Sequence, residues 1–145
     1  MTPRIIYLVK RAEIEITSRM INALETFDLT PIQYTILYFI DINKGDLSSA
    51  QLSRRFSVTP QSMNELVQVL QKKNLLRKKT DPEHARILRI SLTKKGKQLL
   101  EKSNSALDEL ENNLLRNFSV NDIKTLRNLI GKMLEAAMDT NQSGN

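Results

Sequence analysis

Two helix-start signals follow each other closely in the middle of the chain, and they constrain the fold more than any other feature. Ser48 with Gln51 has the pattern of a capping box. Thr59 is an N-cap residue, and Pro60 suits the first helical turn. Apolar residues at helical spacing follow each signal: Leu52 and Phe56, then Met63, Leu66, Val67 and Leu70. Two helices joined by so short a turn must cross steeply, as in a helix-turn-helix.

A β-hairpin is predicted directly after this helix pair. Asn74 suits the left-handed conformation that ends a helix. Residues 75–79 and 87–92 have strand patterns around a turn at 80–84, and we expect Leu88, Ile90 and Leu92 to share one face. The hairpin is basic, which is typical of the wing of a winged helix; its cations are Arg77, Lys79, Arg86 and Arg89.

Amphipathic helices are predicted on both sides of this central segment. Residues 5–27 carry two apolar stripes, of which one is expected to pack on the chain's own core. The second stripe is expected to contact another subunit or a broad surface of the same chain. Further helix starts are predicted at Thr30, Thr93 and Ser119, and the polar segment 139–145 is expected to fray. The apolar positions of the last two helices recur at steps that sum to seven, which favours nearly antiparallel packing.

The positive charge is concentrated in the central segment. Residues 47–97 contain 12 Lys and Arg against only Glu65, Asp81 and Glu83, a net charge of +9, whereas the whole chain carries +6. A charge this large within one segment favours an anionic polymer as the partner.

The composition argues against several kinds of chemistry. The absence of Cys excludes disulfides, thiol catalysis and thiol redox sensing. One His and four Gly offer no arrangement of nucleophile and base and no phosphate loop, so we expect no enzyme, no metal site and no cofactor. The longest apolar runs, such as Ile36–Ile40, are too short to span a bilayer, which predicts a cytoplasmic protein.

The order of these motifs resembles the MarR family of bacterial transcriptional regulators. The resemblance rests on residues 29–37 (Leu-Thr-Pro-Ile-Gln-Tyr-Thr-Ile-Leu), on the helix-turn-helix from Leu52 to Leu70, and on Arg86 ahead of Leu-Thr-Lys-Lys-Gly at 92–96. It implies a mainly α fold with a small β-wing: a winged helix-turn-helix over residues 29–97, with N- and C-terminal dimerisation helices over 1–28 and 98–145. Members of this family are homodimers that bind pseudo-palindromic operators in double-stranded DNA.

Four positions depart from the family pattern. The family usually has basic residues where Glu65 and Val69 stand, a Gly where Asn74 stands, and an Asp where His84 stands. The loss of two positive charges on the second helix of the pair is expected to weaken binding or to shift sequence preference. At the wing, either Asp81 or Glu83 holds Arg86 instead, or His84 leaves it freer.

The recognition helix supplies the candidate base-reading residues. In a helix-turn-helix the N-terminal part of the second helix enters the major groove, and Gln or Asn can pair with adenine through two hydrogen bonds. The candidates are Gln61, Ser62, Asn64 and Gln68, although each amide has about even odds of contacting only phosphate or solvent. Residues expected at phosphate or in the wing contact are Arg54, Arg55, Thr59, Lys72, Arg77, Lys79, Arg86 and Arg89, with Arg86 in the minor groove.

The resemblance also implies a dimer interface and an effector. The expected interface residues are Ile6, Ile14, Ile21, Ile123, Leu126, Ile130 and Met133. Family members are often released from DNA by a small aromatic or anionic effector, for which Arg11, Tyr34 and Tyr38 are candidate contacts, with ordinary packing as the alternative. The predicted function is thus a sequence-specific repressor, and the competing hypothesis is a winged-helix module that contacts protein instead of DNA.

Overall fold

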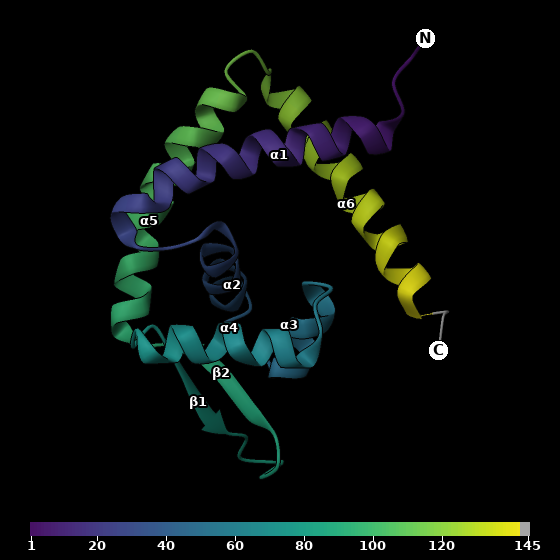
Figure 1. Cartoon of the computed structure of the whole chain (residues 1–145). Helices are drawn as coiled ribbons and strands as arrows, with labels where there is room; N and C mark the ends of the chain where they lie inside the picture. The colour runs from purple at the N-terminus through teal and green to yellow at the C-terminus, as the bar shows by residue number, and fades with distance from the viewer. Residues whose placement is uncertain (143–145) are drawn as a thin grey trace. The chain divides into compact units, whose positions relative to one another are not determined.

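The computed structural model describes residues 1–142, and its helices and strands are labelled in Figure 1. The described chain divides after residue 110 into two compact units. Helix α5 (Lys94–Leu114) crosses the boundary between them, and α6 (Val120–Gln142) lies in the second unit. The elements that precede α5 are α1 (Ile5–Leu24), the short 3-10 helix η1 (Glu25–Phe27), α2 (Pro31–Ile42), α3 (Ser49–Arg55), α4 (Pro60–Lys72), β1 (Leu76–Thr80) and β2 (Leu88–Leu92). The predicted mainly α fold with a small β-wing is confirmed.

The core of the first unit lies under the helix-turn-helix. Helix α2 buries three apolar side chains, and the predicted apolar stripes of α3 and α4 face them. The hairpin closes the core from the other side with Ile90 and Leu92. The fully buried residues of the three helices are Ile36, Leu37, Ile40, Leu52, Met63, Val67 and Leu70.

The predicted helix caps are confirmed at each start. The Ser48 and Thr30 side chains accept hydrogen bonds from the backbone N–H groups of Gln51 and Gln33, and both glutamines bond back to complete capping boxes. Thr93 Oγ1 accepts a hydrogen bond from the N–H of Gly96 at 2.9 Å. Because each pair is local in sequence, it fixes the helix start without help from the core.

The hairpin begins one residue later on each strand than predicted. Its register pairs Leu76 with Leu92 and Thr80 with Leu88. The expectation that Leu88 shares the buried face was wrong, because this end of the hairpin extends beyond the core and leaves Leu88 exposed. Leu47, just before α3, adds a single antiparallel bridge to Ile90, whose N–H donates to the Leu47 carbonyl at 2.8 Å.

Helix α5 approaches the backbone at the start of the hairpin very closely. Gly96 faces the carbonyl group of Leu75, and a Cβ at this position would overlap the carbonyl oxygen and lie 3.1 Å from the carbonyl carbon. The same carbonyl accepts a hydrogen bond from the N–H of Thr93. Gly96 is therefore required by packing, since any side chain would push α5 away from the hairpin.

The prediction for α1 was only partly correct. Residues near its C-terminal end, Met20, Leu24 and Phe27, pack on the core. Toward its N-terminus the apolar side chains are exposed on both faces, among them Ile5, Ile6 and Val9. The reason is that only the C-terminal end of α1 packs on the core, and the apolar pattern of the helix does not indicate how far along α1 the core extends.

The second unit contains the end of α5 and all of α6. Ser119 and Asp122 form the predicted capping box, with side-chain oxygens accepting from each other's backbone N–H at 3.0 Å. Helix α6 continues to Gln142, so the expectation that the chain frays from residue 139 was wrong for residues 139–142. The rest of the predicted frayed segment, residues 143–145, lies outside the described residues. No helix among the described residues is long and apolar enough to cross a membrane.

Candidate nucleic-acid interface

Helix α4 separates polar from apolar side chains along its length. Met63, Val67 and Leu70 are fully buried at helical spacing and anchor the helix to the core. The four base-reading candidates all lie on the exposed side: Gln61, Ser62, Asn64 and Gln68. Glu65 and Val69, where the resemblance leads us to expect cations, are exposed as well. The helix thus presents a mainly polar surface on a rigid support.

The N-terminus of α4 is formed by Thr59 and Pro60. Thr59 Oγ1 accepts from the N–H of Ser62 at 3.1 Å and donates to the Ser62 hydroxyl oxygen at 2.9 Å. The preceding turn passes through Ser57 with a φ of 51°, in the left-handed region. Thr59 is exposed, so the positive end of the helix dipole faces solvent and suits an anion such as phosphate.

Asn64, like Ser62, is a base-reading candidate that already makes a side-chain hydrogen bond within the protein. The Ser49 hydroxyl, on the first residue of α3, donates to Asn64 Oδ1 at 2.6 Å. Pairing with adenine through two hydrogen bonds needs both the amide oxygen and the amide nitrogen. In this arrangement one of the two acceptor positions of Asn64 Oδ1 is occupied, and its amide nitrogen stays available as a donor. No local sequence signal indicates this contact, because Ser49 and Asn64 lie on different helices.

Exposed cations lie on both helices of the pair. Arg54 and Arg55 occupy the last turn of α3, and Lys72 ends α4. The guanidinium carbon of Arg55 lies 5.1 Å from the centroid of the Phe39 ring, which itself packs edge-on against Phe56. Stacking of this kind limits the orientations of an arginine side chain. Arg55 is therefore partly preorganised.

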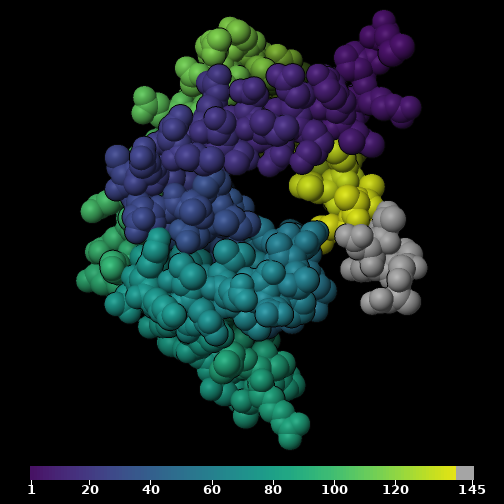
Figure 2. All heavy atoms as spheres, in the orientation of Figure 1, coloured from purple at the N-terminus to yellow at the C-terminus, as the bar shows by residue number. Residues whose placement is uncertain are grey.

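The wing places most of its cations at the surface. Arg77, Lys79 and Arg86 are solvent-accessible, and the tip of the hairpin projects from the rest of the first unit (Figure 2). Arg89 Nε, and not Arg86, donates a hydrogen bond to Asp81 Oδ2 at 2.9 Å. Of the possibilities for the wing, the structure therefore favours an Arg86 side chain that Asp81 does not hold. The N–H of Glu83 and then the Arg89 guanidinium lower the pKa of Asp81 below its ordinary value.

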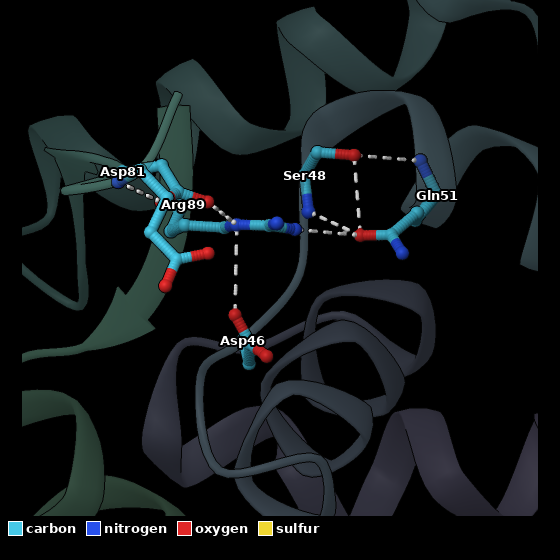
Figure 3. A network of polar contacts seen from close by, with 6 residues as sticks. Asp46, Ser48, Gln51, Asp81 and Arg89 are labelled. Atoms are coloured by element: carbon cyan, nitrogen blue, oxygen red, sulfur yellow. Dashed lines mark hydrogen bonds and ion pairs between the residues drawn. The ribbon is translucent and has the colours of Figure 1, made fainter. Parts of the chain in front are cut away.

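Arg89 differs from the other wing cations. Its side chain is only 27% exposed and contacts Asp81, Asp46 and Gln51 (Figure 3). The sequence predicts a phosphate or wing contact for Arg89 because the hairpin that carries it is basic. Asp46 and Gln51 are far from it along the chain, so spacing could not indicate the cluster.

The effector candidates are held by contacts within the chain. The rings of Tyr34 and Tyr38 stack with centroids 6.0 Å apart, and the Tyr34 hydroxyl donates to Asn104 Oδ1 at 2.7 Å. Arg11 forms an ion pair with Glu15 of the same helix at 3.8 Å. These contacts are consistent with ordinary packing, and a role with an effector stays a prediction. The described residues contain no cluster of three or more His, Cys, Asp or Glu that could hold a metal ion.

The interface candidates form exposed apolar faces. On α1, Ile6 is 75% exposed and Ile14 is 55% exposed. On α6, Ile130 and Met133 are also large exposed side chains. The same holds for Ile21 and Leu126, whereas Ile123 is half-buried. Exposed apolar faces of this extent are typical of association sites.

Comparisons with known proteins agree with this geometry. A model of the MarR family matches residues 27–87, from the end of η1 through the hairpin turn. YhbI of Bacillus subtilis (strain 168), an uncharacterised HTH-type transcriptional regulator, is 28% identical over 99% of this chain and 90% of its own. The HTH-type transcriptional repressor Rv2887 of Mycobacterium tuberculosis is 24% identical over 88% of this chain and 91% of its own.

Solved structures agree on the fold. MepR of Staphylococcus aureus, solved as a complex with DNA, superposes with a TM-score of 0.79 at 24% identity, covering 92% of this chain and 96% of its own. With its capped helix pair, polar α4 surface and basic wing, the central segment of the chain is similar to the MarR family, and the fold is similar to that of MepR.

Proposed function

We propose that this protein is a sequence-specific DNA-binding transcriptional regulator that acts as a homodimeric repressor. One observation carries the proposal: α4 exposes four polar side chains while its opposite face is anchored in the core. A rigid helix with a polar outer surface, beside exposed cations, is the arrangement that enters a major groove. The name of Rv2887 as a repressor and the DNA complex of MepR support it.

In this proposal α4 reads base edges with its amides. Gln61 and Gln68 can each pair with adenine through two hydrogen bonds, so an A·T-containing half-site is expected. Asn64 contributes a donor from its amide nitrogen, while its oxygen already accepts one hydrogen bond from Ser49. Thr59 and the first N–H groups of α4 meet phosphate at the groove edge.

The cations supply affinity in the same arrangement. Arg54, Arg55 and Lys72 flank α4 and are assigned to phosphates, and Arg77 and Lys79 to the backbone beside the wing. Arg86, near the wing tip, is assigned to the minor groove, where a narrow A·T-rich groove attracts arginine. Each phosphate contact releases counterions, so binding must weaken steeply as salt rises.

We assign the exposed apolar faces of α1 and α6 to a second copy of the chain. Residues 1–28 and 98–145 would then form the dimer, and residues 29–97 the DNA-binding part. A two-fold symmetric dimer binds two half-sites about one helical turn apart, which explains why a pseudo-palindrome is expected. Sedimentation should report a dimer, and Ile130→Asp should shift the population toward monomer.

The experiment is a gel shift with mixed-sequence duplex DNA over a salt series, followed by selection of bound fragments from random duplexes. We expect binding at low salt, a steep weakening with rising salt, and inverted half-sites among the selected fragments. Lys72→Ala should weaken binding on all sequences and reduce the salt slope by about 1, as expected when one phosphate is no longer neutralised. Lys102→Ala is the matched control, because it removes an exposed lysine from α5, outside the assigned DNA-binding residues.

A protein-binding module is the competing function. Glu65 and Val69 favour it, since an acidic and an apolar side chain occupy exposed positions of α4. The absence of any shift at low salt would support this alternative and would contradict DNA binding.

A further inference from the structure

Arg89 connects three separate parts of the first unit. It lies in β2 opposite Lys79, and its Nε atom is 2.9 Å from Asp81 Oδ2 in the hairpin turn. The same atom lies 3.5 Å from Asp46 Oδ1 in the loop between α2 and α3. Its Nη1 atom donates to Gln51 Oε1 at 3.3 Å (Figure 3). One side chain thus joins the wing, the preceding loop and the first turn of α3.

Two of these partners also fix their own elements. Gln51 Oε1 accepts from the N–H and the hydroxyl of Ser48, at 2.8 Å and 3.2 Å, as part of the capping box of α3. Asp81 Oδ1 accepts from the N–H of Glu83 at 2.8 Å, and the N–H of Asp81 donates to the Ile87 carbonyl at 2.9 Å. Arg89 therefore links Asp81, which shapes the wing turn, to Gln51, which completes the capping box of α3.

The charge of Arg89 is already balanced. Two carboxylates lie within ion-pair distance of its guanidinium, and its side chain is largely shielded. A phosphate would have to compete with both carboxylates and would meet their repulsion. Among the described residues, the wing cations Arg77, Lys79 and Arg86 form no ion pair.

We propose that Arg89 is a positioning residue of the wing: it holds the hairpin against the N-terminus of α3 so that Arg86 meets DNA, and it does not itself contact phosphate. This inference rests on the proposed DNA-binding function and revises the role predicted for Arg89 from sequence. An ion pair near the surface adds little to overall stability. We therefore expect loss of the Arg89 contacts to make the wing less ordered, with little change in the free energy of unfolding.

The sign of the response to charge removal separates positioning from direct contact. Asp81→Asn and Glu83→Gln each remove one negative charge from the same turn, and only the Asp81 side chain bonds Arg89. If electrostatics alone mattered, both changes would tighten DNA binding. We expect Asp81→Asn to weaken binding to the duplex selected by the wild type by about tenfold, the scale of a single arginine contact with DNA, while Glu83→Gln leaves it equal or tighter.

A double-mutant cycle tests the link to Arg86. We expect Arg89→Gln to weaken binding by about tenfold and to remove most of the effect of a subsequent Arg86→Ala, because Arg86 is then already misplaced. Additive effects, or tighter binding by Asp81→Asn, would overturn the proposal in favour of a direct phosphate contact.

Hydrogen exchange in the free protein provides a measurement that needs no DNA. Arg89→Gln and Asp81→Asn should speed exchange at the N–H groups of Asp81 and Ile87, and Glu83→Gln should not. Equal protection in the wild type and Arg89→Gln would overturn the proposal. If the wild type fails to bind any duplex, the proposed function is wrong, and this measurement still decides whether Arg89 orders the wing.

Discussion

Gly96 gives a sharp test of how the winged helix joins α5. Replacement by Ala places a Cβ 3.1 Å from the carbonyl carbon and 3.3 Å from the Cα of Leu75, and overlaps the carbonyl oxygen. The obstructing atoms are backbone, and the carbonyl is fixed by its bond from Thr93, so no flexible side chain can move aside. Either α5 shifts or the hairpin does.

The magnitude follows from two opposing effects. Overpacking a well-packed site costs about 1–3 kcal/mol, and a clash with backbone belongs near the upper end. Ala is favoured over Gly in a helix by about 1 kcal/mol. The net decrease in the free energy of unfolding is therefore about 2 kcal/mol, using these two estimates together. For a chain of this size that corresponds to a melting temperature lower by about 4–8 °C.

The assay is thermal unfolding followed by circular dichroism at fixed protein concentration, because association would make the melting temperature depend on concentration. Gly131→Ala is the matched control, since a Cβ there meets no described atom within 4 Å outside its chain neighbours and the backbone of its own helix. It should raise stability by about 0.5–1 kcal/mol through helix propensity alone. A Gly96→Ala protein that melts at or above the wild-type temperature would refute the packing argument.

Three further predictions concern the interface. Arg86→Ala should weaken operator binding by about 1–3 kcal/mol in a competition gel shift, and an effect below a few tenths would place it outside the interface. Thr59→Ala should lower the free energy of unfolding by about 1 kcal/mol in urea, because the N–H of Ser62 loses its acceptor; an unchanged midpoint would contradict this. The lowered pKa of Asp81 means that its stabilising contacts are present above its ordinary pKa and are lost as pH falls through the lowered one. Hydrogen exchange at the hairpin turn, corrected for intrinsic rates, should therefore stay constant from about pH 8 to pH 5 and rise only below about pH 4; a rise near pH 6 would point to another group.

Local signals explain why much of the fold could be predicted from the sequence. The capping pairs at Ser48 and Ser119 and the left-handed Asn74 depend on neighbouring residues alone. The apolar stripe of α4 shows which of its faces is buried, and this assigns its exposed polar residues as well. Periodicity alone therefore suffices to place the four base-reading candidates on the exposed side.

Predictions failed where the answer depended on distant residues. Leu88 follows the strand alternation, yet the core does not extend that far. Leu47 forms a single bridge with Ile90, and one residue has no periodicity to detect. Arg89 looks like the other cations of the hairpin in sequence, because Asp46 and Gln51 approach it only after folding. The two stripes of α1 look alike in sequence, so no pattern could show where the core would leave them uncovered.

The hydrogen bond from Ser49 to Asn64 has an evolutionary consequence. A residue on α3 sets which atoms of an α4 amide are available to a partner molecule. Removal of that single hydroxyl would free both acceptor positions of the amide oxygen while leaving every side chain of α4 unchanged. If α4 reads DNA as proposed, paralogues can diverge in the promoters they occupy through inherited changes outside that helix.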